Sequence, residues 1–216
     1  MIEDIRTNLK TKLSGIDSWN RMAVKPIKND IIDNEKLIDY SKLLSKDNLV
    51  KMKKASVLVC FFERNGNYYF PLIRRPIHEK NHPGQIALPG GSREDGETLE
   101  KTALREAFEE VGILPKNVDV IGQMTPLPVP VSKYIIYPFI GITKDEPKWN
   151  LNDREVDELI VLRFDELLRA DNGYYEDWTI KENNLRVPIY KIENMEIWGA
   201  TAAILSELID LSKKSN

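Results

Sequence analysis

The sequence contains a single cysteine, Cys60, so no disulfide can form within the chain. Because Cys60 lies in the apolar run SVLVCFF, we expect it to be a buried, inert thiol. No window approaches the length of apolar sequence that a membrane span needs, and the first residues lack the apolar core of a secretory signal. We therefore expect a cytoplasmic protein that has no membrane partner.

An excess of positive charge is also missing. The 216 residues carry a formal net charge of −3, so no overall basic field favours nucleic acid as a partner. Repeats, low-complexity segments and a clear linker are lacking as well. With 42% hydrophobic and 30% charged residues, the composition is typical of a soluble globular protein, and the length suits one domain with a sizeable core.

Residues 1–50 show no pattern that indicates chemistry. Apolar residues recur at helical spacing over residues 2–13, and Asp33 is suited to cap a second short helix that runs to Leu44. We interpret this segment as an N-terminal helical extension that packs on the domain formed by residues 51–216. This extension could also serve as a homodimer contact.

The longer segment carries strand patterns before and after one central helix. Residues 54–64 and 68–74 are rich in β-branched and aromatic residues, and Asn65-Gly66 between them is a strong hairpin signal. Residues 134–142 form another strand pattern, in which Pro138 indicates an edge strand or a bulge. These elements predict a mixed α/β domain.

The central helix is predicted by apolar residues at steps of four, from Leu99 to Val111, and by Gly112, which suits a left-handed C-terminal position. Polar residues of the same helix are the more informative ones. Glu106 and Glu110 are four residues apart, which puts both carboxylates on one face together with the glutamate between them.

Three neighbouring carboxylates, those of Glu106, Glu109 and Glu110, repel one another on a helix. A divalent cation such as Mg²⁺ would offset this repulsion, because it prefers oxygen ligands. On spacing alone, a solvated acidic surface is favoured over a metal site, because acidic helix faces are common. Gly91 precedes the helix, where its carbonyl can approach a metal closely, and a pair between Glu97 and Arg105 would hold the loop against the helix.

Together these positions follow the pattern G-x5-E-x7-R-E-U-x-E-E-x-G-U, in which U is an aliphatic residue. Every fixed position of the pattern is matched, by Gly91, Glu97, Arg105, Glu106, Ala107, Glu109, Glu110, Gly112 and Ile113. The sequence therefore resembles the Nudix hydrolases. The resemblance implies an α/β/α sandwich around a mixed β-sheet, and hydrolysis of a diphosphate linked to another group with the help of Mg²⁺ or Mn²⁺.

The resemblance also implies roles for individual residues. Glu106, Glu109 and Glu110 should bind metal, with Glu97 and the carbonyl of Gly91 as further ligands. Arg105 should orient a glutamate, and Glu106 is one candidate to activate water. The general base can also lie outside the motif, and Glu155 and Glu158 in the acidic segment DREVDEL are candidates for it, although they could equally be a solvated strand edge.

The segment before the motif points to a substrate. Residues 72–91 resemble the element that coenzyme A pyrophosphatases carry there, with matches at Arg75, Gly84 and the run Pro-Gly-Gly that ends at Gly91. Lys80 and Leu88 stand where that branch has arginine and phenylalanine. Two later stretches, PVSKYIIYPFIG and IWGATAAIL, are also similar to that branch.

Coenzyme A carries a 3′-phosphate and a diphosphate, and cationic side chains of this loop are suited to bind them. The candidates are Arg74, Arg75, Lys80 and His82. We therefore expect hydrolysis of coenzyme A, or of a derivative, to 3′,5′-ADP and 4′-phosphopantetheine. The first alternative keeps the reaction type but changes the substrate: hydrolysis of ADP-ribose or of another nucleoside diphosphate derivative. A non-catalytic Nudix-fold module that binds nucleotides is the alternative of another class.

Overall fold

The computed structural model describes residues 1–11, 13–28, 31–33, 37–79, 82–170, 173–180 and 182–214. Within these ranges an eight-stranded mixed sheet forms the centre, and five of its strands follow the order β10-β4-β3-β9-β7. β3 and β9 run parallel, whereas the other pairs are antiparallel. The five strands are β3 (Lys53–Arg64), β4 (Asn67–Arg74), β7 (Val118–Gln123), β9 (Tyr134–Thr143) and β10 (Glu158–Arg163).

Three short strands extend this sheet beside the main path. β5 pairs with β4, β6 pairs with the first half of β3, and β8 pairs with the first half of β9. They are β5 (Ile86–Ala87), β6 (Gly90–Ser92) and β8 (Leu127–Val129). β6 matters most here, because it brings the glycine pair of the motif onto the central strand.

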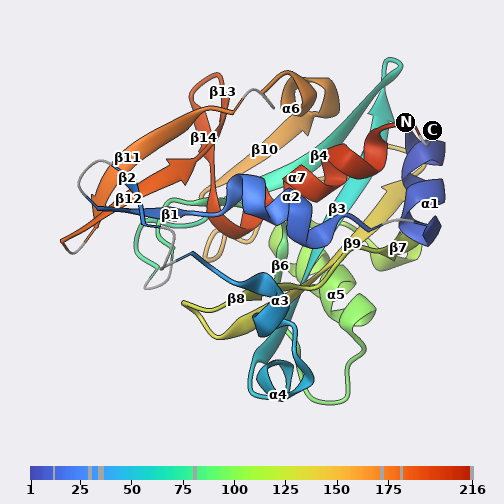
Figure 1. Ribbon diagram of the computed structural model, residues 1–216. Coiled ribbons are helices and arrows are strands. Elements are labelled where there is room, and N and C mark those ends of the chain that lie inside the picture. Colours follow the sequence, from blue (N-terminus) through green and yellow to red (C-terminus); the bar gives the residue numbers. More distant parts are fainter. Residues whose placement is uncertain are drawn as a thin grey trace.

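Helices cover both faces of the sheet, because the side chains of β3 alternate between two apolar clusters. Leu58 and Cys60 join the cluster that includes Ala103 and Ala107 of α5 (Leu99–Val111). Phe61 and its neighbours at alternate positions join the cluster on the opposite face. That face is covered by α1 (Ile2–Thr11), α2 (Gly15–Met22) and α7 (Gly199–Ser212), and α2 and α7 lie in front of the sheet in Figure 1. The predicted α/β/α sandwich is confirmed.

The first 50 residues contribute strands as well as helices. Besides α1 and α2 they form β1 (Lys25–Lys28), β2 (Ile31–Ile32), α3 (Tyr40–Leu43) and α4 (Lys46–Leu49). β1 pairs with β12 (Asn183–Pro188) in a second sheet of order β11-β12-β1-β2, whose other edge is β11 (Tyr175–Ile180). The Asn8 amide donates to the Lys213 carbonyl over 2.9 Å, so the two ends of the chain lie side by side (Figure 1). The division of the chain at residue 50 stays a prediction.

The remaining elements lie in the connections. The 3-10 helix η2 (Pro115–Asn117) lies between α5 and β7, α6 (Phe164–Ala170) lies between β10 and β11, and the hairpin of β13 (Tyr190–Ile192) and β14 (Met195–Ile197) lies between β12 and α7. Among the described residues, no helix has the length and apolar character needed to cross a membrane.

The hairpin predicted at Asn65-Gly66 is confirmed, and both residues have the positive φ angles, 53° and 75°, that a type I′ turn requires. The helix predicted to begin at Asp33 is wrong. Leu37 to Asp39 are not helical, and α3 begins at Tyr40 because the Asp39 carboxylate accepts a hydrogen bond from the Lys42 amide. Residues 34–36 lie outside the described ranges.

The expectation of an edge strand at Pro138 is also wrong, because β9 lies between β3 and β7. The carbonyl of Pro138 accepts from the Met124 amide, so its missing N–H also faces that side. There β7 has ended at Gln123 and β8 begins only at Leu127. An inner strand tolerates this proline because the ladder is interrupted beside it.

Candidate active site

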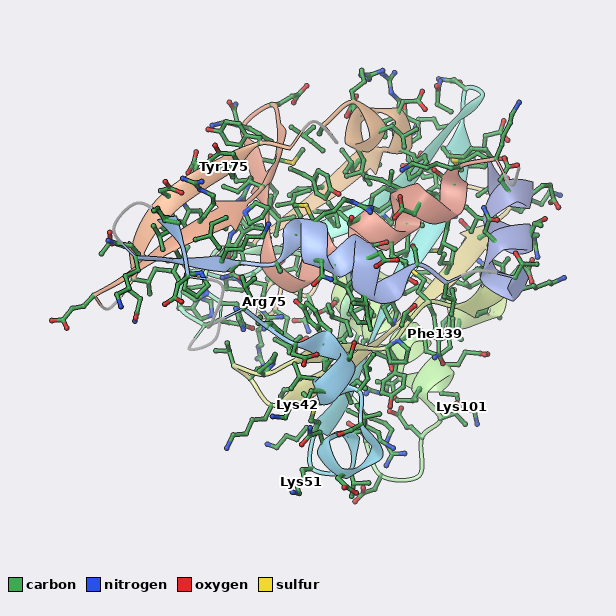
Figure 2. All side chains as sticks on the ribbon, viewed as in Figure 1. Lys42, Lys51, Arg75, Lys101, Phe139 and Tyr175 are labelled. Atoms are coloured by element: carbon green, nitrogen blue, oxygen red, sulfur yellow. The ribbon has the colours of Figure 1, made fainter. Side chains whose placement is uncertain are left out.

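Helix α5 is fixed at both ends. The Thr98 hydroxyl accepts a hydrogen bond from the Lys101 amide at the N-terminus. Gly112 has a φ of 82°, and its amide donates to two carbonyls of the last turn. A Cβ at Gly112 would lie 2.7 Å from the Asn150 nitrogen, so only glycine lets the segment after β9 approach the end of the helix. Lys101, labelled in Figure 2, is exposed on the outer side of α5.

The glycine pair of β6 brings the backbone against two of the glutamates. A Cβ at Gly91 would lie 2.5–2.6 Å from the carboxyl atoms of Glu106, so a larger residue here would displace that carboxylate. The Gly90 amide donates to Glu110 Oε2 over 2.8 Å. The sheet therefore holds the Glu110 carboxylate through a backbone amide and leaves room for the Glu106 carboxylate against Gly91.

Arg105 gathers most of the remaining acidic groups. Its Nε donates to Glu97 Oε1 over 2.7 Å, and its Nη1 lies 2.9 Å from Glu106 Oε1 and 2.8 Å from Glu109 Oε2. The hydrogen bond from Arg105 is the main reason why the pKa of Glu97 falls to about 2. A planar guanidinium with five donors suits this role, and it ties the loop after β6 to the helix.

Glu110 and Glu106 carry a high electrostatic cost. Only 4% of Glu110 is exposed, and burial raises the pKa of its carboxyl to about 8 despite the Gly90 hydrogen bond. Burial likewise raises the pKa of Glu106, and the charges of Glu109 and Glu155 add to the effect. The acidic face is thus short of positive charge.

The donor set of this face fits a hard divalent cation, because it offers only oxygen atoms and one carboxylate is seated where a Cβ would be. Within the described ranges, no three Asp, Glu, His or Cys side chains already stand in a metal-binding arrangement. Arg105 instead pairs with oxygens of Glu106 and Glu109. Side-chain rotation of these two residues would therefore accompany metal binding.

The two candidate bases outside the motif differ in their surroundings. The segment that carries Glu155 is bound to the end of α5, because the Asn152 amide donates to the Glu110 carbonyl over 3.0 Å. Glu155 is exposed, and its charge raises the pKa of both Glu106 and Glu110. Glu158 lies on β10 opposite Arg74 and accepts from Arg74 Nε over 2.7 Å.

Two of the expected substrate-binding cations are engaged with carboxylates. Arg74 pairs with Glu158, and Arg75 pairs with Glu79 within the same loop. Arg75 also lies near enough to Glu110 to oppose the rise of its pKa (Arg75 is labelled in Figure 2). His82 is exposed, with a φ of 57°. Lys80 lies outside the described residues.

Sequence reasoning missed two features of this region. The Thr102 hydroxyl donates to Glu97 Oε2 over 2.9 Å and helps Arg105 to hold that side chain, and its place on the first turn of the helix was the only signal for this role. Lys53, Lys54 and Arg93 also gather beside the motif, around a cavity at the end of the sheet. They are far apart in sequence, so the pattern of the chain could not bring them together.

Comparisons with known proteins agree with this geometry. A model of the NUDIX domain matches residues 52–182. The chain is 36% identical over 138 residues to the uncharacterized Nudix hydrolase NudL of Pectobacterium atrosepticum, covering 63% of this chain and 71% of that protein. It is 35% identical over 173 residues to Nudix hydrolase 15, mitochondrial, of Arabidopsis thaliana, covering 75% of this chain and 60% of that protein.

Solved structures share the fold at lower identity. The Nudix hydrolase RenU of M. smegmatis has a TM-score of 0.52 and 19% identity over 76% of this chain and 90% of that one. A MutT/nudix family protein from Enterococcus faecalis has a TM-score of 0.51 and 16% identity over 78% of this chain and 69% of that one. Members of this family generally use divalent metal ions. With a matching family model over more than half of its length, the chain belongs to the Nudix family and is a hydrolase of phosphoanhydride bonds.

Proposed function

We propose that the protein hydrolyses the diphosphate of coenzyme A, or of a derivative, to 3′,5′-ADP and 4′-phosphopantetheine with Mg²⁺ or Mn²⁺. One observation carries the proposal. The segment with the coenzyme A-like pattern ends at the glycine pair, and its Gly90 amide donates to Glu110 Oε2 over 2.8 Å, so this segment borders the acidic face of α5. Reaction chemistry and substrate recognition therefore meet at the same place.

In this proposal Glu106, Glu109 and Glu110 are the metal ligands, with Glu97 and the Gly91 carbonyl as further oxygen donors. Bound divalent cations neutralise the anionic diphosphate and lower the pKa of water. The protein contributes the positioning: the Gly90 amide holds Glu110, and Arg105 holds Glu97 and Glu109.

Water attacks one phosphorus of the diphosphate, and the bond from that phosphorus to the bridging oxygen breaks. We assign Glu155 as the group that accepts the proton of the attacking water, with Glu106 as the alternative. Glu155 is exposed, lies within electrostatic reach of Glu106 and Glu110, and is carried by a segment bound to α5. Glu158 is less suited, because Arg74 already binds its carboxylate.

On the substrate side, Arg75 is the central cation of the proposal. Its pair with Glu79 spans only four residues of one loop, so a phosphate oxygen can replace the carboxylate oxygen without moving the strands. Arg74, Lys80 and His82 are the other proposed contacts to substrate phosphates. The proposed partner is a small-molecule nucleotide substrate, and a cytoplasmic location and a homodimer remain part of the proposal.

The decisive experiment compares substrates. We expect the kcat/KM of the wild-type protein to be highest for coenzyme A, lower for dephospho-coenzyme A and lowest for ADP-ribose, with Mg²⁺ or Mn²⁺ present. If ADP-ribose is the best substrate by a wide margin, the coenzyme assignment is wrong. If no diphosphate is hydrolysed under any of these conditions, a nucleotide-binding module becomes the better account.

A matched pair of variants tests the base. Glu155→Gln should lower kcat and remove the acidic limb of the pH–rate profile, because amides do not accept this proton. Glu158→Gln should leave both nearly unchanged. Equal losses in the two variants, or a larger loss in Glu158→Gln, would contradict the assignment of Glu155.

A further inference from the structure

A cavity of about 420 Å³ opens at the end of the sheet, beside the motif. It lies where β3 and β9 begin and β6 ends, because Lys53 is paired with Tyr134 and Ala55 with Ser92. Its size is within the range of small-molecule pockets, about 300–1,000 Å³. The cavity is lined by Met52, Lys53, Lys54, Ser92, Arg93 and Tyr134, and we call it the basic cavity.

The lining carries three cations and no carboxylate. Among the described residues, neither Lys53 nor Lys54 forms an ion pair, in contrast to Arg74 and Arg75 in the loop. Within the described part of the chain, the Arg93 guanidinium donates only to a backbone carbonyl, that of Glu97, over 3.5 Å. A lining with this charge and without a counterion is suited to an anionic ligand.

The cavity also offers neutral hydrogen-bonding groups. The hydroxyls of Ser92 and Tyr134 lie 3.0 Å apart at one wall, and Lys53 Nζ lies 5.9 Å from the centre of the Tyr134 ring. The Arg93 amide donates to the Lys54 carbonyl over 2.9 Å, which holds the two cationic residues side by side. Because side chains alternate along β3, Lys53 lies with Ser92 and Tyr134 on one side of the sheet end and Lys54 lies with Arg93 on the other. Both sides can donate hydrogen bonds to a phosphate held at the rim between them.

The basic cavity is connected to the acidic face of α5. Ser92 follows Gly91 directly, and its carbonyl accepts from Arg105 Nη2 over 3.2 Å. A molecule with its diphosphate at Glu106 and Glu110 can therefore place another anionic group in the cavity. Repulsion from the glutamates would disfavour that group on α5 itself.

We propose that the basic cavity binds a phosphomonoester of the substrate, one that is not cleaved. The 3′-phosphate of coenzyme A is such a group, and this step rests on the proposed function. A phosphomonoester carries about −1.5 to −2 charges at pH 7 and three acceptor oxygens, which matches three cations and two hydroxyls. The cavity would then select for the coenzyme that carries the 3′-phosphate. Arg74 and Arg75 are less available for this phosphate, because each is already paired with a glutamate.

The first test uses the double variant Lys53→Gln/Lys54→Gln. Its kcat/KM for coenzyme A should fall about 10- to 100-fold, the range that loss of charged hydrogen bonds produces, with little change for dephospho-coenzyme A. The variant Lys51→Gln is the matched control. Lys51 is exposed near α4, outside the cavity (Figure 2), and its replacement should change neither substrate. Equal losses for both substrates, or none for either, would overturn the proposal.

A binding experiment separates this proposal from the proposed function. Calorimetric titration of the full chain should show tighter binding of 3′,5′-ADP than of 5′-AMP, and the double variant should lose the difference. That result supports the cavity even if the wild type does not hydrolyse coenzyme A. If inorganic phosphate binds the cavity but the two nucleotides bind equally, the site takes free phosphate and the substrate assignment is wrong.

Discussion

Two buried glutamates, Glu110 on α5 and Glu207 on α7, lie on opposite faces of the same sheet. Glu207 is fully buried, and its Oε1 accepts from the Gly15 amide and from both the amide and the hydroxyl of Thr125. Among the described residues, the Glu110 carboxylate accepts one hydrogen bond, from the Gly90 amide, and it has Glu106 as an acidic neighbour. Burial raises the pKa of both carboxyls.

The difference lies in what compensates each buried carboxyl. Three donors from two segments compensate the Oε1 atom of Glu207 and fasten the start of α2 to α7, whereas its Oε2 atom has no partner among the described residues and Asp210 adds to the rise of its pKa. Glu110 has a single donor and two acidic neighbours, Glu106 and Glu155, so its need for positive charge is the greater. The comparison teaches that burial alone does not identify a functional carboxylate. The number of donors around it is more informative.

Among the variants that test this comparison, we expect the largest loss of activity from substitution of Glu110. Glu110→Gln should lower kcat about 100-fold or more, because a neutral amide cannot replace a metal-binding carboxylate. Steady-state kinetics checks this, with Glu100→Gln on the exposed first turn of α5 as the matched control. A variant of Glu110 that turns over at nearly the normal rate would show that the acidic face is only a surface.

A smaller loss is expected when the groups around the acidic face are changed. Arg105→Lys keeps the charge but loses the fork that joins Glu97 to Glu109. We expect kcat/KM to fall about 10- to 100-fold, as for other residues that orient metal ligands. An unchanged kcat/KM would mean that the order imposed by Arg105 does not matter for the reaction.

On the other side of the comparison, Glu207→Leu should act on stability. It leaves the amides of Gly15 and Thr125 without their acceptor, which costs about 1–3 kcal/mol of the free energy of unfolding. Glu207→Gln keeps an acceptor and should cost less. Urea unfolding measures both, and kcat of the folded variants should stay within a few-fold of the wild type. A large loss of kcat in Glu207→Gln would contradict the purely structural role.

The smallest effect is a pH dependence. Because burial raises the pKa of Glu207 above its ordinary value of 4.5, the folded state holds this proton more tightly than the unfolded state. The associated stability is fully present below the ordinary value and is lost as pH rises through the folded-state pKa. The stability of the wild type relative to Glu207→Gln should therefore decline with rising pH. Urea unfolding of both proteins, from below pH 4.5 upwards, measures this relative stability. A wild type that gains stability relative to Glu207→Gln as pH rises would contradict the prediction.

The parts of the site that the sequence could predict depend on local patterns. The α5 helix, its terminal Gly112 and the hairpin at Asn65-Gly66 follow from neighbouring residues, and all are confirmed. The α/β/α arrangement came from the family resemblance rather than from periodicity.

What the sequence could not predict depends on contacts between distant segments. The pairing of β1 with β12 and the place of Pro138 on an inner strand arise from such contacts. So does the gathering of Lys53 with Arg93 around one cavity. Periodicity reports which side of an element is apolar, but not which other segment will cover it.

The central claim is that the acidic face of α5 binds divalent cations and that the other buried glutamate does not take part. Calorimetric titration with Mn²⁺ tests this directly on three proteins: the wild type, Glu110→Gln and Glu207→Gln. We predict that the wild type and Glu207→Gln bind Mn²⁺ with similar affinity, whereas Glu110→Gln binds it at least about tenfold more weakly. Equal affinity in all three proteins, or a loss confined to Glu207→Gln, would contradict the account.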